Sequence, residues 1–173
     1  MSSFTSRVIG IGKIEDLIQD LSKWSKEGVE EMLDTLAVKG EETARQGFEN
    51  AVYDGTNDVQ VETEKGNDSR SIIAKGESVT FIEYGTGVYY NGSGSYMGEL
   101  PPGISGIGGY GKGLGKNDYW FYSGQPGNAG GALANGHPNS TITHGNPANN
   151  CMYLAGEEII KAIPDAAKKV FHD

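Results

Sequence analysis

The chain has 173 residues, 36% of them hydrophobic and 21% charged, which is the size and composition of one globular domain spanning residues 1–173. No apolar run approaches the roughly 18 residues that cross a bilayer, and the N-terminus lacks a secretory h-region and cleavage pattern, so a membrane or secreted protein is not expected. With 14 basic and 23 acidic residues the net charge is −9, which argues against tight or sequence-specific DNA binding, although a wall of like charge lets DNA pass without adhering.

Glycine is the compositional outlier, with 27 residues in the chain. Counted along the sequence, 18 of them lie between Gly85 and Gly145, a stretch with only four charged residues. It also holds most of the tyrosines, which argues against simple disorder because disordered segments are usually poor in aromatics. We therefore expect a long Gly/Tyr-rich insertion, residues 88–143, mounted on an otherwise ordinary domain.

The N-terminal third predicts helices. A short apolar stretch at 8–11 is a candidate edge strand, and the helical spacing then begins at Ile14 and continues to Trp24. Ser25 is placed to cap a second helix that runs to Ala51, with Gly28 marking a bend. Small residues near its end, at Gly40, Ala44 and Gly47, predict a close approach to a sheet.

Strand patterns follow the turn at 54–57. Alternation over 58–64 predicts one strand, 71–74 a second, and 79–84 a third, with turns at 65–68 and 75–78. Three short consecutive strands predict an antiparallel meander.

The C-terminal segment predicts one more amphipathic helix. Asn146 and Pro147 are suited to its start, apolar residues recur every three or four positions as far as Val170, and Pro164 is expected to break or kink it after Ile163. The expected fold is α+β: an antiparallel β-meander with a long helix in the N-terminal half and a C-terminal helix packed on one face, plus the insertion.

Three residue patterns could indicate a phosphate, metal or catalytic site, and each also has a purely structural interpretation. Residues 106–112 match two glycine-rich phosphate-loop patterns, but no strand precedes them and no helix follows. The spacing of His137, His144 and Cys151 fits no known metal site. A hydrolase would require Glu83 and His144 within hydrogen-bonding reach, without a recognisable nucleophile. We therefore expect no enzyme, no cofactor and no metal.

The aromatics of the insertion form a candidate interaction surface. Rings supply contact area at small entropic cost, so they suit subunit contacts, packing of the loop onto its own domain, or a glycan-binding module that uses the Tyr and Trp side chains. The residues concerned are Tyr89, Tyr90, Tyr96, Tyr110, Tyr119, Trp120, Phe121 and Tyr122.

Two short motifs carry a family resemblance. The first is Glu83-Tyr84-Gly85-Thr86-Gly87, and the second is Thr143-His144-Gly145-Asn146-Pro147-Ala148, followed by Met152 and Tyr153. Together with the long helix and the segment from Tyr53 to Val59, they resemble the tail-component family of long-tailed bacteriophages. The similarity covers the N-terminal helices, the meander and the C-terminal helix, while the glycine-rich middle is only loosely similar.

The resemblance implies a structural role in the virion. Such a protein would act in the neck or head-proximal tail, in tail completion and head-tail joining, as a ring through which DNA passes and which could form only in the assembled particle. Its partners would be copies of itself, head-completion proteins and tail-terminator proteins, and it would occupy the host cytoplasm during assembly. The alternatives are a tail terminator or another minor tail protein and, from a different class, the glycan-binding module.

The two motifs also predict one structural corner. Gly85 and Gly87 let the chain leave the third strand sharply, and the Glu83 carboxylate is expected to cap exposed amides at the start of the last helix. The candidate corner residues are Glu83, Tyr84, Gly85, Thr86, Gly87, Gly145, Asn146, Pro147, Ala148 and Met152.

Overall fold

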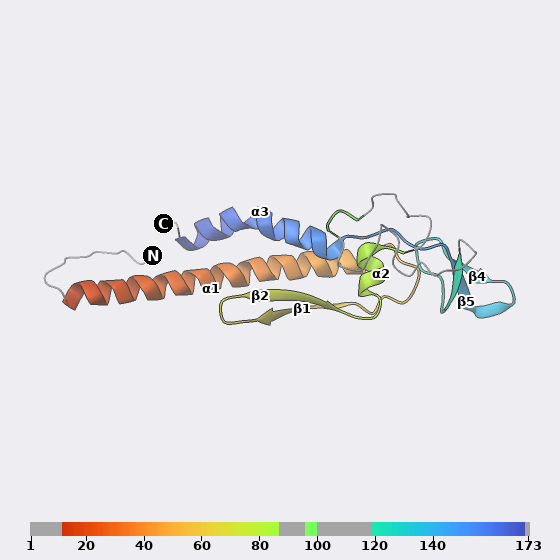
Figure 1. Ribbon diagram of the computed structural model, residues 1–173, viewed down its shortest axis with the longest axis horizontal. Helices are drawn as coiled ribbons and strands as arrows, with labels where there is room; N and C mark the ends of the chain where they lie inside the picture. The colour runs from red at the N-terminus through yellow and green to blue at the C-terminus, as the bar shows by residue number, and fades with distance from the viewer. Residues whose placement is uncertain (1–11, 87–95, 100–118, 172–173) are drawn as a thin grey trace.

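The computed structural model describes residues 12–86, 96–99 and 119–171. These residues form three helices and two small antiparallel sheets in an elongated body, so the expected α+β class is confirmed (Figure 1). The elements in chain order are α1 (Gly12–Glu49), β1 (Gln60–Lys65), β2 (Arg70–Lys75), α2 (Val79–Tyr84), β3 (Trp120–Ser123), β4 (Ala132–Ala134), β5 (His137–Thr143) and α3 (Cys151–Phe171). The candidate strand at 8–11 lies outside the described residues.

Helix α1 is continuous over 38 residues, so the predicted second start at Ser25 is wrong. Gly28 does not bend the chain. A Cβ at this position would lie 2.6 Å from the Phe171 ring and 2.8 Å from a Val170 methyl, both on α3. The glycine is therefore explained by close helix packing rather than by a helix boundary.

Helices α1 and α3 pack antiparallel along a seam of small residues. A Cβ on Gly40 would lie 2.5 Å from the Ile159 side chain, and one on Gly47 would lie 3.1 Å from the Cβ of Cys151. The predicted close approach is thus real, but its main partner is α3. The first sheet contributes only at Gly40, where the Ile72 side chain would be 2.4 Å away.

Strands β1 and β2 form a hairpin that lies along α1 (Figure 1), and Ile72 of β2 and Ile159 of α3 both lie over Gly40. The register runs from Gln60 opposite Lys75 to Lys65 opposite Arg70, and the turn is closed by the Gly66 amide donating to the Ser69 carbonyl at 3.0 Å. The first two predicted strands are confirmed.

The third predicted strand is wrong, because residues 79–84 form the short helix α2. A distant carboxylate holds the residues just before this helix: Asp58 accepts the amides of Glu77 at 2.8 Å and Ser78 at 3.0 Å, and also the Ser78 hydroxyl. Val79, Ile82 and Glu83 then fall on helical spacing, and Ile82 becomes fully buried. A short apolar run does not by itself distinguish a strand from a helical turn.

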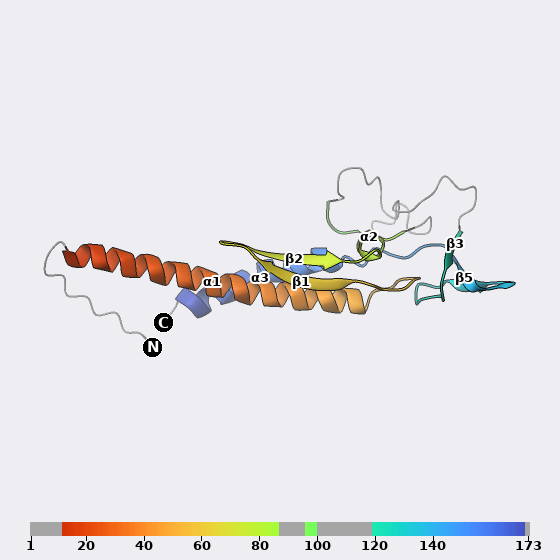
Figure 2. The same ribbon diagram turned by 90° about the horizontal axis from the view of Figure 1, so that it is seen from below.

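The second sheet lies beyond the C-terminal end of α1 (Figure 2) and has the strand order β3-β5-β4. Trp120 pairs with Thr143 at one end, and a turn at Asn135-Gly136, with Gly136 at φ +78°, joins β4 to β5. Residues 120–123 therefore form a strand, as part of this separate sheet rather than of the first one.

Helix α3 begins at Cys151 and not at Asn146-Pro147, because residues 146–150 make a connection described below. It also continues through Pro164 to Phe171, so the predicted break is wrong. Buried Ala155 and Ala166 lie on either side of the proline, so the helix is packed both before and after the position that lacks an amide donor.

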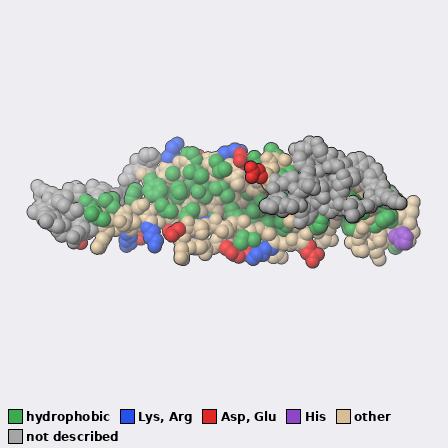
Figure 3. All heavy atoms as spheres, in the orientation of Figure 1, with side chains coloured by type: hydrophobic (Ala, Val, Ile, Leu, Met, Phe, Trp, Pro, Cys, Tyr) green, Lys and Arg blue, Asp and Glu red, His purple; other side chains and the backbone are tan. Residues whose placement is uncertain are grey.

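The main core is small and lies where α1, the hairpin, α2 and the start of α3 meet. Its buried side chains are Phe48, Ala51, Ile82 and Cys151. By contrast, the N-terminal half of α1 keeps a row of apolar side chains in solvent: Ile18 is 56% exposed, Leu21 45% and Trp24 51%. Hydrophobic side chains are also visible over the helical body in the space-filling view (Figure 3).

Candidate functional site

The candidate site is the region where the two resemblance motifs meet. Glu83 stands in α2, its side chain is almost fully buried, and its carboxylate accepts the amides of Met152 at 2.9 Å and Tyr153 at 3.2 Å. These amides belong to the first turn of α3, which has no partners for them within the helix. Glu83 is therefore the cap of α3, the contact that the sequence predicted, a few residues further along the chain.

A pair of backbone hydrogen bonds joins the motifs directly. The Thr86 amide donates to the Asn146 carbonyl at 2.9 Å, and the Asn146 amide donates back to the Thr86 carbonyl at 3.2 Å. Gly85 comes just before this bridge at φ +75°, and a Cβ there would lie 2.6 Å from the amide nitrogen of Ala148. Only glycine fits both that backbone angle and that space.

Two further asparagines, neither of which was among the predicted corner residues, connect the segments of the corner by hydrogen bonds. The Asn149 amide group donates to the carbonyls of Val52 at 3.0 Å and Ile82 at 3.1 Å, so it links α2 to the segment after α1. Asn150, at φ 56°, donates its backbone amide to the Glu83 carbonyl at 3.3 Å. Both follow the Asn-Pro pair that drew attention as a helix start, so the signal was present but was assigned to the wrong role.

Burial changes the acidity of two groups at the corner. Desolvation raises the pKa of Glu83 above its ordinary value, and the amides of residues 151–153 offset this in part. Burial, with the Glu83 charge as a second cause, raises the pKa of the Cys151 thiol to about 12. The carboxylate thus acts as a buried structural cap, and the thiol as a small core side chain.

A second buried acid, Asp54, lies in the turn after α1. The Thr143 hydroxyl donates to its Oδ2 at 2.9 Å, and the Ala129 amide donates to its Oδ1 at 3.2 Å. Nearby, Asn128 accepts the Tyr53 amide at 2.7 Å and donates to the Ala51 carbonyl at 3.2 Å. These contacts fasten the second sheet and its loop to the end of α1.

A cavity of about 470 Å³ opens between this turn, the Thr86–Asn146 bridge and strand β3. Its walls combine aromatic rings with hydroxyl and amide groups and with the Asp54 carboxylate. The described lining residues are Tyr53, Asp54, Gly55, Thr56, Phe81, Thr86, Trp120, Tyr122, Ser123, Thr143 and Asn146. The cavity combines aromatic walls with a few convergent polar groups, which is typical of small-ligand sites.

The aromatics singled out from the sequence separate into three places. Trp120 and Tyr122 line the cavity, while Phe121 points to the other face of β3, 56% exposed, with Tyr119 at a ring distance of 5.8 Å. Tyr96 packs edge-on against Tyr84, with ring centroids 4.8 Å apart, at the corner. Tyr89, Tyr90, Tyr110 and Gly87 lie outside the described residues, as does the glycine-rich pattern at 106–112.

The residues considered for a metal do not converge in the described part of the chain, which holds no cluster of three or more His, Cys, Asp or Glu side chains suited to a metal ion. His137 starts β5 in solvent, His144 makes a ring contact with Tyr119 at 6.1 Å, and Cys151 is in the core.

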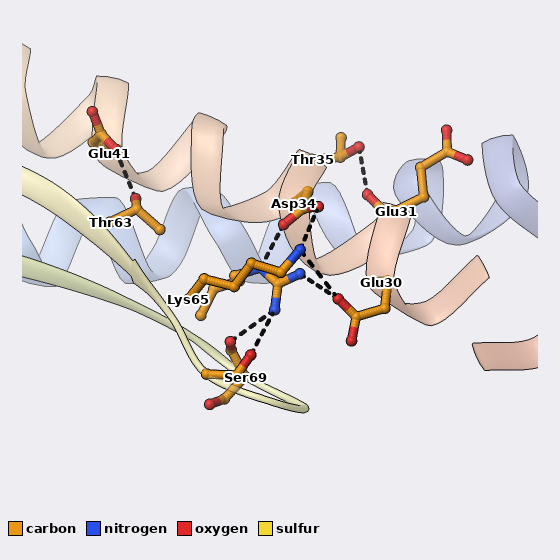
Figure 4. Close-up of polar contacts among 10 residues, drawn as sticks. Glu30, Glu31, Asp34, Thr35, Glu41, Thr63, Lys65 and Ser69 are labelled. Atoms are coloured by element: carbon orange, nitrogen blue, oxygen red, sulfur yellow. Dashed lines mark hydrogen bonds and ion pairs between the residues drawn. The ribbon is translucent and has the colours of Figure 1, made fainter. Parts of the chain in front are cut away.

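An ion cluster fixes the hairpin to α1 away from the corner (Figure 4). The Arg70 side chain is 4% exposed and contacts Glu30 at 2.6 Å and Asp34 at 2.5 Å, and Lys65 lies 3.4 Å from Glu30. The Arg70 hydrogen bonds are the main cause that lowers the pKa of both carboxyls. The cluster sets the hairpin position along the helix.

Comparison of the chain with protein-family models, with curated proteins and with solved structures finds no match. Among the described helices, none has the length and apolar character required to cross a membrane. The fold and the corner are therefore described on their own terms, and the function follows as a proposal.

Proposed function

We propose that the protein is a structural component of a long-tailed phage virion, placed in the neck or at the head-proximal end of the tail, where copies form a ring around the DNA channel. The observation that carries the proposal is the direct pairing of the two resemblance motifs. Thr86 and Asn146, 60 positions apart, exchange backbone hydrogen bonds, and Glu83 caps α3 beside them. The motif pair thus corresponds to one physical element, as expected if both were kept for the same fold.

The projecting half of α1 supports assembly through subunit contacts. A helix of 38 residues is about 57 Å long, whereas a compact domain of this length is roughly 40 Å across, so one end of α1 extends past the body. Ile18, Leu21 and Trp24 remain about half exposed there, on one side of the helix. An apolar row of this kind is stabilised when a partner covers it. In the proposed ring, the partner is a second copy of the chain.

The charge balance fits the proposed surroundings. A net charge of −9 repels a polyanion at short range, so a ring of such subunits would let DNA slide without holding it. Head-completion and tail-terminator proteins would then contact the two faces of the ring, and the exposed Phe121 and Leu133 of the second sheet offer apolar contact area for one of them.

The test is deletion of the gene in the phage that carries it, with complementation from a plasmid. We expect separate filled heads and tails without the protein, and joined infectious particles when it is restored. Complete infectious particles in its absence would refute the proposal. Cryo-electron microscopy of the joined particle then locates the density, and a position away from the neck and the head-proximal tail would favour another minor tail protein.

Matched variants test the role of α1. Ile18→Glu with Leu21→Glu changes the charge by −2 on the apolar row, and Lys23→Glu changes it by the same amount at a side chain that is 75% exposed. We expect the double variant to fold but fail to restore joining, and Lys23→Glu to restore it. Equal complementation by both would exclude the row as a subunit contact.

A further inference from the structure

The cavity beside Asp54 has a charge character that its shape alone does not explain. Asp54 is 6% exposed, and an isolated buried carboxylate is costly unless it is paired. Its neighbours in the described structure are one amide and one hydroxyl, and the ion pairs found there do not include it. An ionised carboxylate accepts about four hydrogen bonds, so two such donors leave it under-satisfied.

The lining offers further acceptors and ring faces but no cation. None of the described residues around the cavity is Lys, Arg or His. Tyr53, Phe81, Trp120 and Tyr122 present aromatic rings, whose faces are electron-rich and attract positive charge. A cation entering the cavity would meet both the carboxylate and the rings.

Two phenol groups of the lining lie close enough to Asp54 to be affected by its charge. Burial is the main cause that raises the pKa of Tyr122, a hydrogen bond with Thr141 opposes this, and the negative charge of Asp54 raises the pKa further. Burial likewise raises the pKa of Tyr53, with Tyr122, Asp58 and Asp54 as additional causes. The burial part of these shifts disfavours a charge of either sign, and only the part that comes from the Asp54 charge would favour a cation.

We propose that this cavity binds a guanidinium group, with the Asp54 carboxylate as the ion-pair partner and the rings of Trp120 and Tyr122 as its walls. A guanidinium is flat, weakly hydrated and forked, so it can stack on a ring and donate two hydrogen bonds to one carboxylate. The site does not depend on the role in the virion, because it follows from the cavity alone.

The chain provides its own optical probe. Trp24 and Trp120 are the two tryptophans, so Trp24→Phe leaves Trp120 as the sole emitter while keeping a ring beside Phe171. In this background, fluorescence is titrated with N-acetylarginine amide at constant ionic strength, and in parallel with N-acetylcitrulline amide, the neutral analogue of nearly the same shape. We expect a saturable change with the arginine compound and at least about tenfold weaker binding of the citrulline compound.

A matched pair of variants assigns the effect to the cavity. Asp54→Asn should weaken binding of N-acetylarginine amide at least about tenfold, whereas Asp165→Asn, the same change at a side chain that is 88% exposed and outside the lining, should leave it within about twofold. If Asp54→Asn fails to fold, the comparison of arginine and citrulline compounds on the Trp24→Phe protein still decides. Equal binding of the two compounds, or no saturable change with either, overturns the proposal.

Two further probes define the source and the class of ligand. Tighter binding of N-acetylarginine amide than of methylguanidinium supports an arginine side chain of a neighbouring protein, and the reverse order supports a free solute; both keep the guanidinium assignment. Saturation by methyl β-glucoside in place of the cations would overturn it in favour of a glycan site.

Discussion

Substitutions at Glu83 measure how much the corner contributes to stability. Glu83→Ala removes the acceptor of the Met152 and Tyr153 amides, at 2.9 and 3.2 Å, from a site that is 3% exposed. Each buried donor left without a partner costs about 1–3 kcal/mol, and loss of a helix cap alone costs about 0.5–2 kcal/mol. Because the two amides are partly accessible to water once the side chain is gone, we expect a loss of about 3 kcal/mol, or roughly 6–12 °C in Tm.

Glu83→Gln separates the hydrogen bonds from the charge. The Gln side chain keeps one of the two acceptor oxygens and loses the other, and the cost of that lost hydrogen bond is offset by removing the cost of burying a negative charge, so the free energy of unfolding at pH 7 should change by less than about 1 kcal/mol. Urea unfolding followed by circular dichroism provides the measurement. A Glu83→Ala protein within about 1 kcal/mol of the unchanged protein would refute the capping role.

The pH dependence of the free energy of unfolding gives an independent test of how Glu83 is buried. Because burial raises the pKa of Glu83 in the folded state, the folded protein binds the proton more tightly than the unfolded chain does. The stability from this group is complete below its unfolded pKa and is lost as pH rises through the folded pKa. Lowering the pH from 7 towards 4.5 should therefore stabilise the unchanged protein relative to Glu83→Gln. The opposite trend would show that the amides, not desolvation, dominate.

Further substitutions and one reactivity measurement test other parts of the fold. Gly85→Val should lower the free energy of unfolding by about 3 kcal/mol, because φ is +75° and the new Cβ would contact the Ala148 amide. Gly130→Ala, at φ +102° with open space around it, should cost only the backbone strain of about 1 kcal/mol. Equal losses in urea unfolding would contradict the proposed clash. Gly40→Val should destabilise the helix seam by about 1–3 kcal/mol, while Gly156→Ala, with nothing within 4 Å, should stabilise α3 by up to about 1 kcal/mol, both measured by thermal unfolding. Arg70 lowers the pKa of Glu30 and Asp34, so the stability from these pairs is present above their ordinary pKa values and lost as pH falls; Arg70→Met should flatten this acid-side loss in Tm. The Cys151 thiol, with its pKa raised to about 12, should react with Ellman's reagent at pH 8 at least about a hundredfold slower in the folded protein than in urea.

The spacing of apolar residues along the sequence predicts best those helices and strands whose formation depends least on contacts with distant residues. The helical spacing around Leu17, Leu21 and Trp24 and the alternation in β1 are properties of consecutive residues, so they survive without tertiary information. The small residues at Gly40 and Gly47 were also visible as points of close approach. Their partner was not, because a glycine shows that something comes near without showing what.

The wrong predictions of secondary structure concern segments that are held by side chains distant in the sequence. Residues 79–84 have an apolar pattern compatible with a strand, and the residues just before them are held by Asp58, twenty positions before Ser78. The loop at Asn128 is fastened to Tyr53 and Ala51 across about 75 positions, which no local pattern encodes. The hairpin of the second sheet, by contrast, has a local sequence signal, because Asn135-Gly136 is a strong turn sequence between two short strands.

The turn at 54–58 connects the end of α1, the helix α2 and the second sheet through side-chain hydrogen bonds. Asp54 fastens the second sheet through Thr143, Asn57 donates to the Phe48 carbonyl at the end of α1 at 2.7 Å, and Asp58 accepts the Ser78 amide just before α2. The two aspartates and the asparagine each use a side-chain oxygen or amide on a backbone or hydroxyl partner. With a buried core as small as that around Phe48, apolar packing alone leaves these positions weakly defined. The corner and the cavity therefore depend on this turn, and a ligand bound at Asp54 would act on the same residues that position α2 and the cap of α3.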